Sequence, residues 1–146
     1  HALKFRHELA LAPLLGGILG RAIAAAEGTP VHCIAPVPLS RARLRERGFN
    51  QALEIARAFS GRAPLEPGLL ERARDTLAQF DLPWSERQRN VRGAFRVAQP
   101  VDGLTVAVVD DVMTTGATLD EIARTLKAAG AAGVVNWVLA RTPAPG

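Results

Sequence analysis

The segment from Val106 to Thr118 limits the fold more than any other part of the sequence. Residues 104–109 (LTVAVV) are apolar and rich in β-branched side chains, which is typical of a strand buried on both faces. Residues 119–129 have helical periodicity, and Thr118 followed by Glu121 is a capping-box pattern, so we expect a helix to begin there. A strand, a short polar loop and a helix in this order predict an α/β fold.

The loop between this strand and this helix has the composition of a phosphate site. The first turn of a helix favours an anion, and Gly116 and Ala117 let the backbone approach a phosphate closely. Three threonines add hydroxyl donors: Thr114, Thr115 and Thr118. Asp110 and Asp111 repel a phosphate but suit hydroxyl groups or a cation. Together these groups predict a site for a ribose 5-phosphate.

Residues 106–118 fit other common motifs less well. A plain strand–helix turn with a solvated acid pair remains the alternative for Asp110 and Asp111. The sequence has no GxxxxGK[ST] and no GxGxxG pattern, which argues against a P-loop and a dinucleotide fingerprint. An acid pair could indicate a response-regulator receiver, but the threonine-rich loop would have no role there.

Two further apolar runs, residues 31–37 and 134–140, predict strands that join residues 104–109 in a parallel sheet. Because ligands bind beyond the carboxyl ends of such strands, Asp110 and Ser40 could share one site. Residues 2–27 predict one long helix, or two helices divided at Gly16-Gly17. We expect a single domain over residues 1–146, with residues 141–146 as a tail.

Capping residues predict the starts of two more helices. Asn50 can cap a helix that runs to about Ser60. Ser85 followed by Gln88 is a second capping box, which predicts a short helix through about Asn90.

The net charge is +4, and almost all of the positively charged side chains are arginines. Arginine binds phosphate through paired N–H groups. Arginines recur at alternate positions from Arg41 to Arg47, either as a solvated face or as a cationic rim for an anion such as pyrophosphate. Aromatic residues are only 5% and tyrosine is absent, so a nucleic-acid partner is a secondary expectation. No apolar run has the length of a membrane span, no secretion signal is seen, and Cys33 is the only cysteine, so we expect a cytoplasmic protein without a membrane partner.

The acid pair and the loop closely resemble the 5-phosphoribosyl-1-pyrophosphate (PRPP) signature of type I phosphoribosyltransferases. The resemblance implies a parallel-sheet type I phosphoribosyltransferase fold with flanking helices and a small hood or flexible loop. It also implies that Asp110 and Asp111 bind the ribose hydroxyls. Mg²⁺ is the expected cofactor, and the resemblance implies that these two residues bind it indirectly. The residues that it assigns to PRPP are Asp110, Asp111, Val112, Met113, Thr114, Thr115, Gly116, Ala117 and Thr118.

Motifs along nearly the whole chain resemble the ComF/GntX family of phosphoribosyltransferase-like proteins, some of which are linked to DNA uptake in natural competence. The matching pieces, in order, are Pro36-Val-Pro38, Arg47-Gly-Phe-Asn-Gln51, Arg74, Thr76, Gln79, Glu86-Arg87, Asn90-Val91 and Gly93-Ala-Phe95. Members of that family usually carry an N-terminal four-cysteine zinc segment. This sequence has none, so nothing about that segment is transferred.

By this resemblance, residues 72–83 are the flexible loop that closes over PRPP, with Arg74 and Gln79 as its contacts; no catalytic residue is otherwise assigned. Arg87 and Asn90 either contact the ligand or pin that loop to the body. The expected pyrophosphate side consists of Leu39, Ser40, Arg41 and Arg47.

The expected function is transfer of phosphoribosyl from PRPP to an unidentified nitrogen acceptor, with release of pyrophosphate. The alternative is a PRPP or nucleotide sensor, or a DNA-uptake adaptor, that keeps the fold without turnover. A homodimer is also expected, since type I relatives are often dimers.

Overall fold

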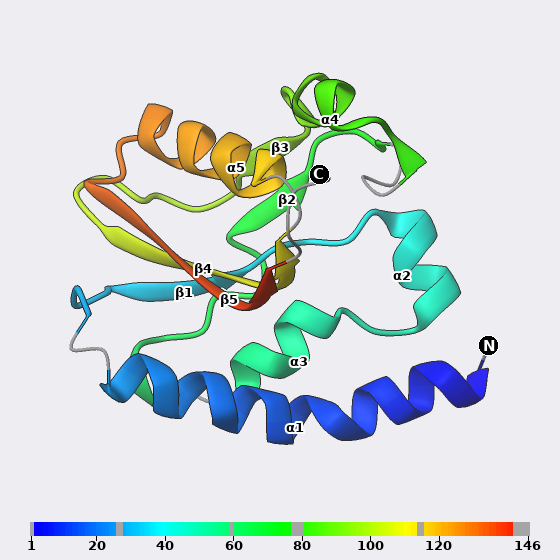
Figure 1. The fold of residues 1–146 in the computed structure, drawn as a ribbon. Coiled ribbons are helices and arrows are strands. Elements are labelled where there is room, and N and C mark those ends of the chain that lie inside the picture. The colour runs from blue at the N-terminus through cyan, green and yellow to red at the C-terminus, as the bar shows by residue number, and fades with distance from the viewer. Residues whose placement is uncertain (1, 26–27, 59, 77–80, 114–115, 142–146) are drawn as a thin grey trace.

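The computed structural model describes residues 2–25, 28–58, 60–76, 81–113 and 116–141. In chain order its elements are α1 (Ala2–Ala25), β1 (Cys33–Pro36), α2 (Arg41–Arg47), α3 (Gln51–Arg57), a 3-10 helix (Ser60–Arg62), β2 (Leu70–Arg72), α4 (Trp84–Val91), β3 (Phe95–Val97), β4 (Thr105–Met113), α5 (Ala117–Ala128) and β5 (Gly133–Arg141). Figure 1 shows a central sheet with α1 and α3 on one side and α5 on the other.

The central sheet is parallel and has the order β1-β4-β5, which confirms the predicted parallel sheet. The strand β4 is its middle strand, and alternate side chains along it enter different clusters. Val106 and Val108 pack with Leu119 and Ile122 of α5. Ala107 and Val109 pack on the opposite face, with apolar residues of α1 and α3. This burial on both faces explains the uninterrupted apolar run in the sequence.

A second sheet pairs β2 with β3 in antiparallel register, so that Arg72 lies opposite Phe95. Leu70 and Phe95 of this sheet belong to the same apolar cluster as α5. The cluster therefore holds the small sheet against the α5 side of the central sheet, and Arg72 ends its strand next to the carboxyl ends of the parallel strands.

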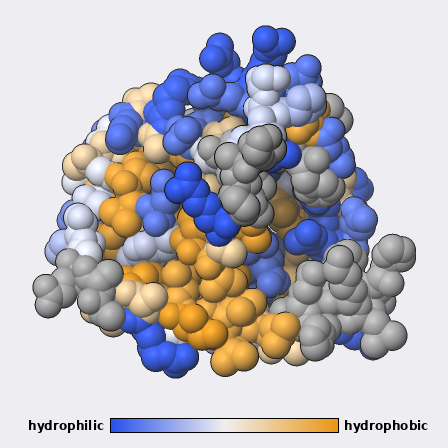
Figure 2. All heavy atoms as spheres, in the orientation of Figure 1, coloured by the Kyte–Doolittle hydropathy of each residue, from blue (hydrophilic) through white to orange (hydrophobic). Residues whose placement is uncertain are grey.

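The helix α1 is continuous through Gly16 and Gly17, so the alternative of two shorter helices is wrong. Gly16 is needed for contact, because a Cβ atom there would lie 2.5 Å from both Ala58 Cβ and the carbonyl oxygen of Ile55. Apolar side chains gather over the lower part of the face in Figure 2, where Figure 1 places α1, and the exposed ones on this helix are Leu9, Leu11, Leu14 and Ile18. Within the residues that the structure describes, every helix is too short or too polar to cross a bilayer.

Both predicted capping boxes are wrong. The helix α5 begins at Ala117 with Gly116 as its N-cap, so Thr118 lies in the first turn. Glu121 cannot reach back to a cap, because its carboxylate accepts hydrogen bonds from Gly93 N at 2.9 Å and from Arg124. The helix α4 likewise begins at Trp84, one residue before the expected Ser85 cap, and no side chain caps it.

The strand boundaries differ from those expected for the central sheet. The strand β4 continues through Asp110 and Asp111 to Met113, because β5 remains paired with it as far as Arg141. Arg141 therefore belongs to β5 and not to the tail, whose other residues lie outside the described part of the chain. The strand β1 is shorter than expected and covers Cys33–Pro36 only.

Candidate functional site

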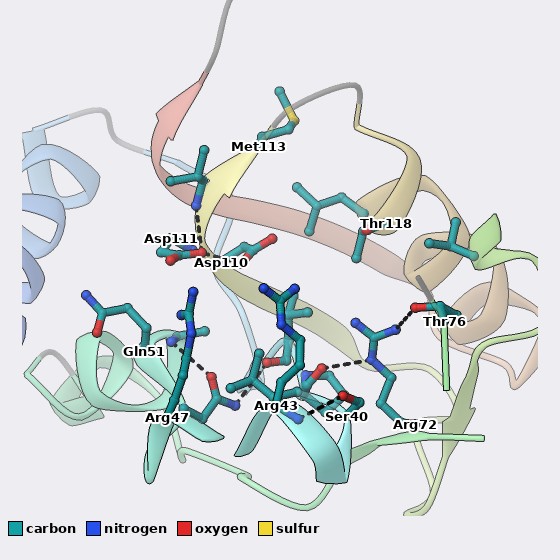
Figure 3. Close-up of a pocket in the computed structure, with 18 of the residues that line it drawn as sticks. Ser40, Arg43, Arg47, Gln51, Arg72, Thr76, Asp110, Asp111, Met113 and Thr118 are labelled. Atoms are coloured by element: carbon teal, nitrogen blue, oxygen red, sulfur yellow. Dashed lines mark hydrogen bonds between the residues drawn. The ribbon is translucent and has the colours of Figure 1, made fainter. Parts of the chain in front are cut away.

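A cavity of about 300 Å³ lies at the carboxyl ends of β1 and β4. Ser40 and Asp110 both line it, so the ends of these two strands share one cavity, as expected from their positions in the sequence. Figure 3 shows three arginines extending toward the acid pair and Thr118 from the opposite side. The lining residues are Val37, Pro38, Leu39, Ser40, Arg43, Arg47, Asn50, Gln51, Ala52, Arg72, Thr76, Val91, Asp110, Asp111, Val112, Met113, Gly116, Thr118 and Leu119.

Most of the residues assigned to PRPP by resemblance line this cavity: Asp110, Asp111, Val112, Met113, Gly116 and Thr118. Ala117 is buried and borders a neighbouring hollow instead. Thr114 and Thr115 lie outside the described residues. Gly116 has a φ of 84°, which only a residue without a side chain adopts easily. It ends the loop and is the N-cap of α5.

Three of the four residues expected on the pyrophosphate side line the cavity: Leu39, Ser40 and Arg47. Arg41 is exposed and is not among the lining residues. Ser40 is buried, and its Oγ accepts a hydrogen bond from Arg43 N at 3.2 Å, so it caps α2. This cap turns α2 so that Arg43 and Arg47, one helical turn apart, both face the cavity.

The helix α3 is tied to the end of β1 by Asn50, as its predicted capping role requires. The side-chain Oδ1 of Asn50 accepts a hydrogen bond from Ala52 N at 3.1 Å, and its Nδ2 donates to Val37 O at 3.0 Å. The next residue, Gln51, is only 9% exposed, and its Oε1 has no hydrogen-bond partner among the described residues. A buried polar atom without a partner is costly, and here it belongs to a residue that lines the cavity.

The acid pair sits at the point where β4 enters the cavity. Burial, and then the charge of Asp111, raise the pKa of Asp110 to about 8, while Arg72 acts in the opposite direction. Asp110 Oδ1 accepts a hydrogen bond from Asp111 N at 2.9 Å, and Asp111 Oδ1 accepts one from Val112 N at 2.8 Å. Two acids held this close would be stabilised in their ionised form by a cation or by hydroxyl donors.

The chemistry of this pair suits Mg²⁺, which prefers oxygen ligands and keeps several waters. Within the described residues, however, no group of three or more histidine, cysteine, aspartate or glutamate side chains could hold a metal ion. A magnesium ion at this site would therefore need oxygens from a bound ligand and from water in addition to the carboxylates. Such an arrangement fits an ion that enters with a phosphorylated ligand.

The residues assigned to the flexible loop have a different place. Arg74 Nη2 donates to the carbonyl oxygens of Asn90 and Arg92, at 2.7 and 2.6 Å, and it does not line the main cavity. Arg87 is buried, and its Nε donates to Leu82 O at 3.1 Å, as the pinning interpretation predicts. Arg74 and Arg87 thus hold the two ends of this segment against α4, and Gln79 lies outside the described residues.

Sequence reasoning did not assign Asn50 or Gln51 to the site. It included Arg43 only as one of the alternating arginines of residues 41–47, and Arg72 and Thr76 only as members of the loop at residues 72–83. A signal for Arg43 was present, because Ser40 is a good N-cap and its helix brings Arg43 to the same side as Arg47. The resemblance placed Arg72 at the start of the flexible loop, whereas the structure places it at the end of β2, from which it reaches the cavity.

A family model described as a phosphoribosyl transferase domain matches residues 37–145. The chain is 37% identical to the DNA utilization protein YhgH of Salmonella typhi, over 97% of this chain and 65% of that protein. It is 33% identical to competence protein F of Haemophilus influenzae, over 94% of this chain and 64% of that protein. The chain thus spans about 65% of the length of the curated relatives that it matches first.

Among solved structures, the chain is similar to a glutamine phosphoribosylpyrophosphate (PRPP) amidotransferase from B. subtilis complexed with ADP and GMP. The sequences are 25% identical, the match covers 90% of this chain and 26% of that one, and the TM-score is 0.56.

Proposed function

The chain belongs to the phosphoribosyl transferase domain family, and from this premise we propose that its cavity binds PRPP with Mg²⁺ and that the protein transfers the phosphoribosyl group to a nitrogen acceptor. One observation carries the proposal. A single cavity presents a half-buried acid pair on one side and three arginines on the other, with the N-terminus of α5 between them. PRPP has hydroxyl groups for the acids and two separate phosphate groups for the remaining elements.

The 5-phosphate would lie at the N-terminus of α5. The helix has twelve residues, so its dipole favours an anion there, and its N-cap, Gly116, provides no side-chain hydrogen bond to the first turn. Thr118 lines the same end of the cavity and adds a hydroxyl group. The left-handed backbone of Gly116 lets the chain turn into the helix without a side chain between the phosphate and the backbone.

Asp110 and Asp111 would accept hydrogen bonds from the ribose hydroxyls. These bonds and a nearby cation favour the ionised carboxylate, so ligand binding would lower the raised pKa of Asp110. Bound Mg²⁺ would supply positive charge for the leaving pyrophosphate. The acid pair thereby orients the sugar and contributes oxygen atoms near the ion.

The pyrophosphate would lie beside the turn at Leu39 and Ser40, facing Arg43 and Arg47. These cations stabilise the charge that develops when the bond from the sugar to pyrophosphate breaks. The acceptor nitrogen forms the new bond to the same sugar carbon and loses a proton. We assign no general base, because phosphoribosyl transfer can rely on positioning and on stabilisation of the leaving group.

A second candidate function is a DNA-related role without turnover. It is favoured by the names of the relatives, which are a DNA utilization protein and a competence protein. The exposed arginines of α2, Arg41 and Arg45, would supply contacts to phosphates. In this role the fold would serve as an adaptor or a PRPP sensor, and the acceptor would be absent.

The test is release of pyrophosphate from PRPP in the presence of Mg²⁺ and a panel of purine, pyrimidine and simple amine acceptors. We expect acceptor-dependent release that is lost in the Asp110→Asn, Asp111→Asn double variant. Binding of single-stranded DNA is measured in parallel over a range of salt concentrations. DNA binding that weakens steeply with salt and ignores the double variant, with no pyrophosphate release, would favour the adaptor instead.

A further inference from the structure

Arg72 is the one cavity-lining arginine that comes from neither α2 nor the central sheet. It is the last residue of β2, where it lies opposite Phe95 of β3. Figure 3 shows its guanidinium directed toward Thr76 and the cavity, on the same side as Ser40 and Arg43. The small antiparallel sheet therefore contributes a cation to a site that the parallel strands otherwise form.

The guanidinium of Arg72 is held in a fixed orientation. Its Nε donates to Pro38 O at 3.1 Å, and its Nη1 donates to Thr76 Oγ1 at 2.9 Å. Its central carbon lies 4.7 Å from the centroid of the Phe95 ring, which supports the flat face of the group. The remaining N–H groups have no acceptor among the described residues, so one edge of the guanidinium is available to a ligand.

This cation has no carboxylate partner within ion-pair distance in the described part of the chain. The ion pairs found there join Arg57 with Glu54, Arg96 with Glu71, and Arg124 with Glu121. Burial first, and then the neighbouring charge of Arg43, lower the pKa of Arg72, while the charges of Asp110 and Asp75 act in the opposite direction. A cation that is partly removed from water is stabilised by an opposite charge. An anionic ligand in this cavity would add negative charge beside Arg72 and Arg43 to that already supplied by Asp110.

We propose that Arg72 is a diphosphate-binding residue, whose free guanidinium edge holds the pyrophosphate half of the ligand beside the turn that begins at Pro38. This inference rests on the proposed function. It assigns a ligand contact to a residue outside the segment 110–118, which the resemblance assigned to PRPP. The position follows from the contact with Pro38 O, which directly precedes Leu39 and Ser40. A planar, bidentate donor fixed on three sides suits adjacent phosphate oxygens.

The alternative is that Arg72 only supports the fold, by joining Pro38 to Thr76 and packing on Phe95. The two roles differ in which half of the ligand they affect. Support of the fold as a whole would affect both halves equally or neither, whereas a loss of pyrophosphate binding alone places Arg72 at the diphosphate end of the ligand.

The experiment is calorimetric titration of inorganic pyrophosphate with Mg²⁺, and separately of ribose 5-phosphate, into the wild-type protein and four variants. Arg72→Met keeps the length of the side chain and removes the charge, and Arg72→Lys keeps the charge and removes the planar donor. Thr76→Val leaves Arg72 in place and releases its Nη1. Arg96→Met is the matched control, because Arg96 lies on β3 next to Phe95 and pairs with Glu71 outside the cavity.

We expect Arg72→Met to weaken pyrophosphate binding by about 10- to 100-fold, the loss typical of a hydrogen bond to a charged group. Arg72→Lys should give a smaller loss, and Thr76→Val a loss of about two- to tenfold. Ribose 5-phosphate binding should stay within about twofold in all variants, and Arg96→Met should change neither ligand.

Unchanged pyrophosphate binding in Arg72→Met and Thr76→Val, or an equal loss of both ligands in every folded Arg72 variant, would overturn the inference while leaving the proposed function standing. If Arg72→Met does not fold, Arg72→Lys and Thr76→Val decide between these outcomes. If wild-type protein binds neither half, the proposed function fails and the role of Arg72 fails with it.

Discussion

The carboxylate of Asp110 accepts a hydrogen bond from the backbone N–H of Asp111 at 2.9 Å, so that two neighbouring acids are fixed together within the last part of β4. The pairing of Asp110 with Val138 keeps this part of β4 in the sheet. The pair is therefore held by the main chain and does not depend on a flexible loop for its position. This arrangement has an electrostatic cost, because both carboxylates face the same cavity and repel each other.

That cost predicts a pH dependence of stability. Because the pKa of Asp110 is raised to about 8, the folded state binds more protons than the unfolded state from about pH 4 to pH 8, and stability falls as the pH rises through this window. Asp110→Asn removes this effect. We expect the variant to be more stable than wild type at pH 8, by on the order of a few kcal/mol, and the difference to shrink toward pH 4.

Thermal unfolding in a chelating buffer at pH 5 and pH 8 measures this difference. Asp81→Asn is the control, because Asp81 is exposed and lies outside the main cavity. An equal effect of Asp110→Asn at both pH values would contradict the account.

The N-cap of α5 predicts a loss of affinity in Gly116→Ala. The φ of 84° would strain any other residue by about 1 kcal/mol, although a Cβ atom would meet nothing closer than Met113 Sδ at 3.8 Å. We expect the start of the helix to shift and PRPP binding to weaken by about tenfold, while the free energy of unfolding falls by about 1 kcal/mol.

Gly103→Ala is the matched control for Gly116→Ala. Gly103 has a φ of 74° and open space around its Cα, and it is not among the lining residues of the cavity. It should show the same loss of stability in denaturant unfolding without a loss of affinity. Equal affinity losses in both variants would show that general strain, and not the phosphate loop, is responsible.

The contact of α1 with α3 predicts that Gly16→Ala is destabilising. The added Cβ would overlap Ala58 Cβ and the Ile55 carbonyl, and the backbone cannot move away as a side chain could. We expect a loss of about 1–3 kcal/mol in denaturant unfolding. Gly17→Ala meets only Arg21 Nη1, at 3.9 Å, and should be neutral or stabilising. A neutral Gly16→Ala would mean that α1 does not pack on α3 as described.

Glu121 predicts a second pH effect, of the opposite sign. Its carboxylate is buried and accepts hydrogen bonds from Arg124 and from Gly93 N, and these contacts, chiefly that with Arg124, lower its pKa. The stabilisation is present above about pH 4, near the unfolded value, and is lost as the pH falls through the lowered folded pKa.

Glu121→Gln should therefore lower the free energy of unfolding at pH 7 by about 1–2 kcal/mol and have less effect in acid. Urea unfolding at pH 7 and pH 3 measures both values. Arg124→Gln should cost less at pH 7, because Arg124 is exposed and solvent screens its charge. A larger loss in Arg124→Gln than in Glu121→Gln would contradict this account of the contact with Gly93.

Much of this architecture follows from local patterns in the sequence. The apolar run at residues 104–109 predicted a buried strand, because burial on both faces leaves no polar position, and in the structure this strand is the middle one. Since the strands are parallel, the positions of Asp110 and Ser40 were enough to predict a shared site. Asn50 was predicted as a cap because its side chain competes well for backbone N–H groups.

Other features were not predictable from local patterns. The helix α2 has no buried residue, so it shows no apolar periodicity, and the alternating arginines concealed it. Asp110 and Asp111 look like loop residues, although β5 holds them in the sheet. Arg72 reaches the cavity only because the small sheet packs against the α5 side of the central sheet, a long-range relationship that no motif contains.

The most direct test of the central claim is calorimetric titration of PRPP into the protein with and without Mg²⁺, beside the Asp110→Asn, Asp111→Asn double variant. The account predicts binding that requires Mg²⁺ and is lost in a double variant that remains folded. Absence of binding to folded wild-type protein, or equal binding by the double variant, would contradict it.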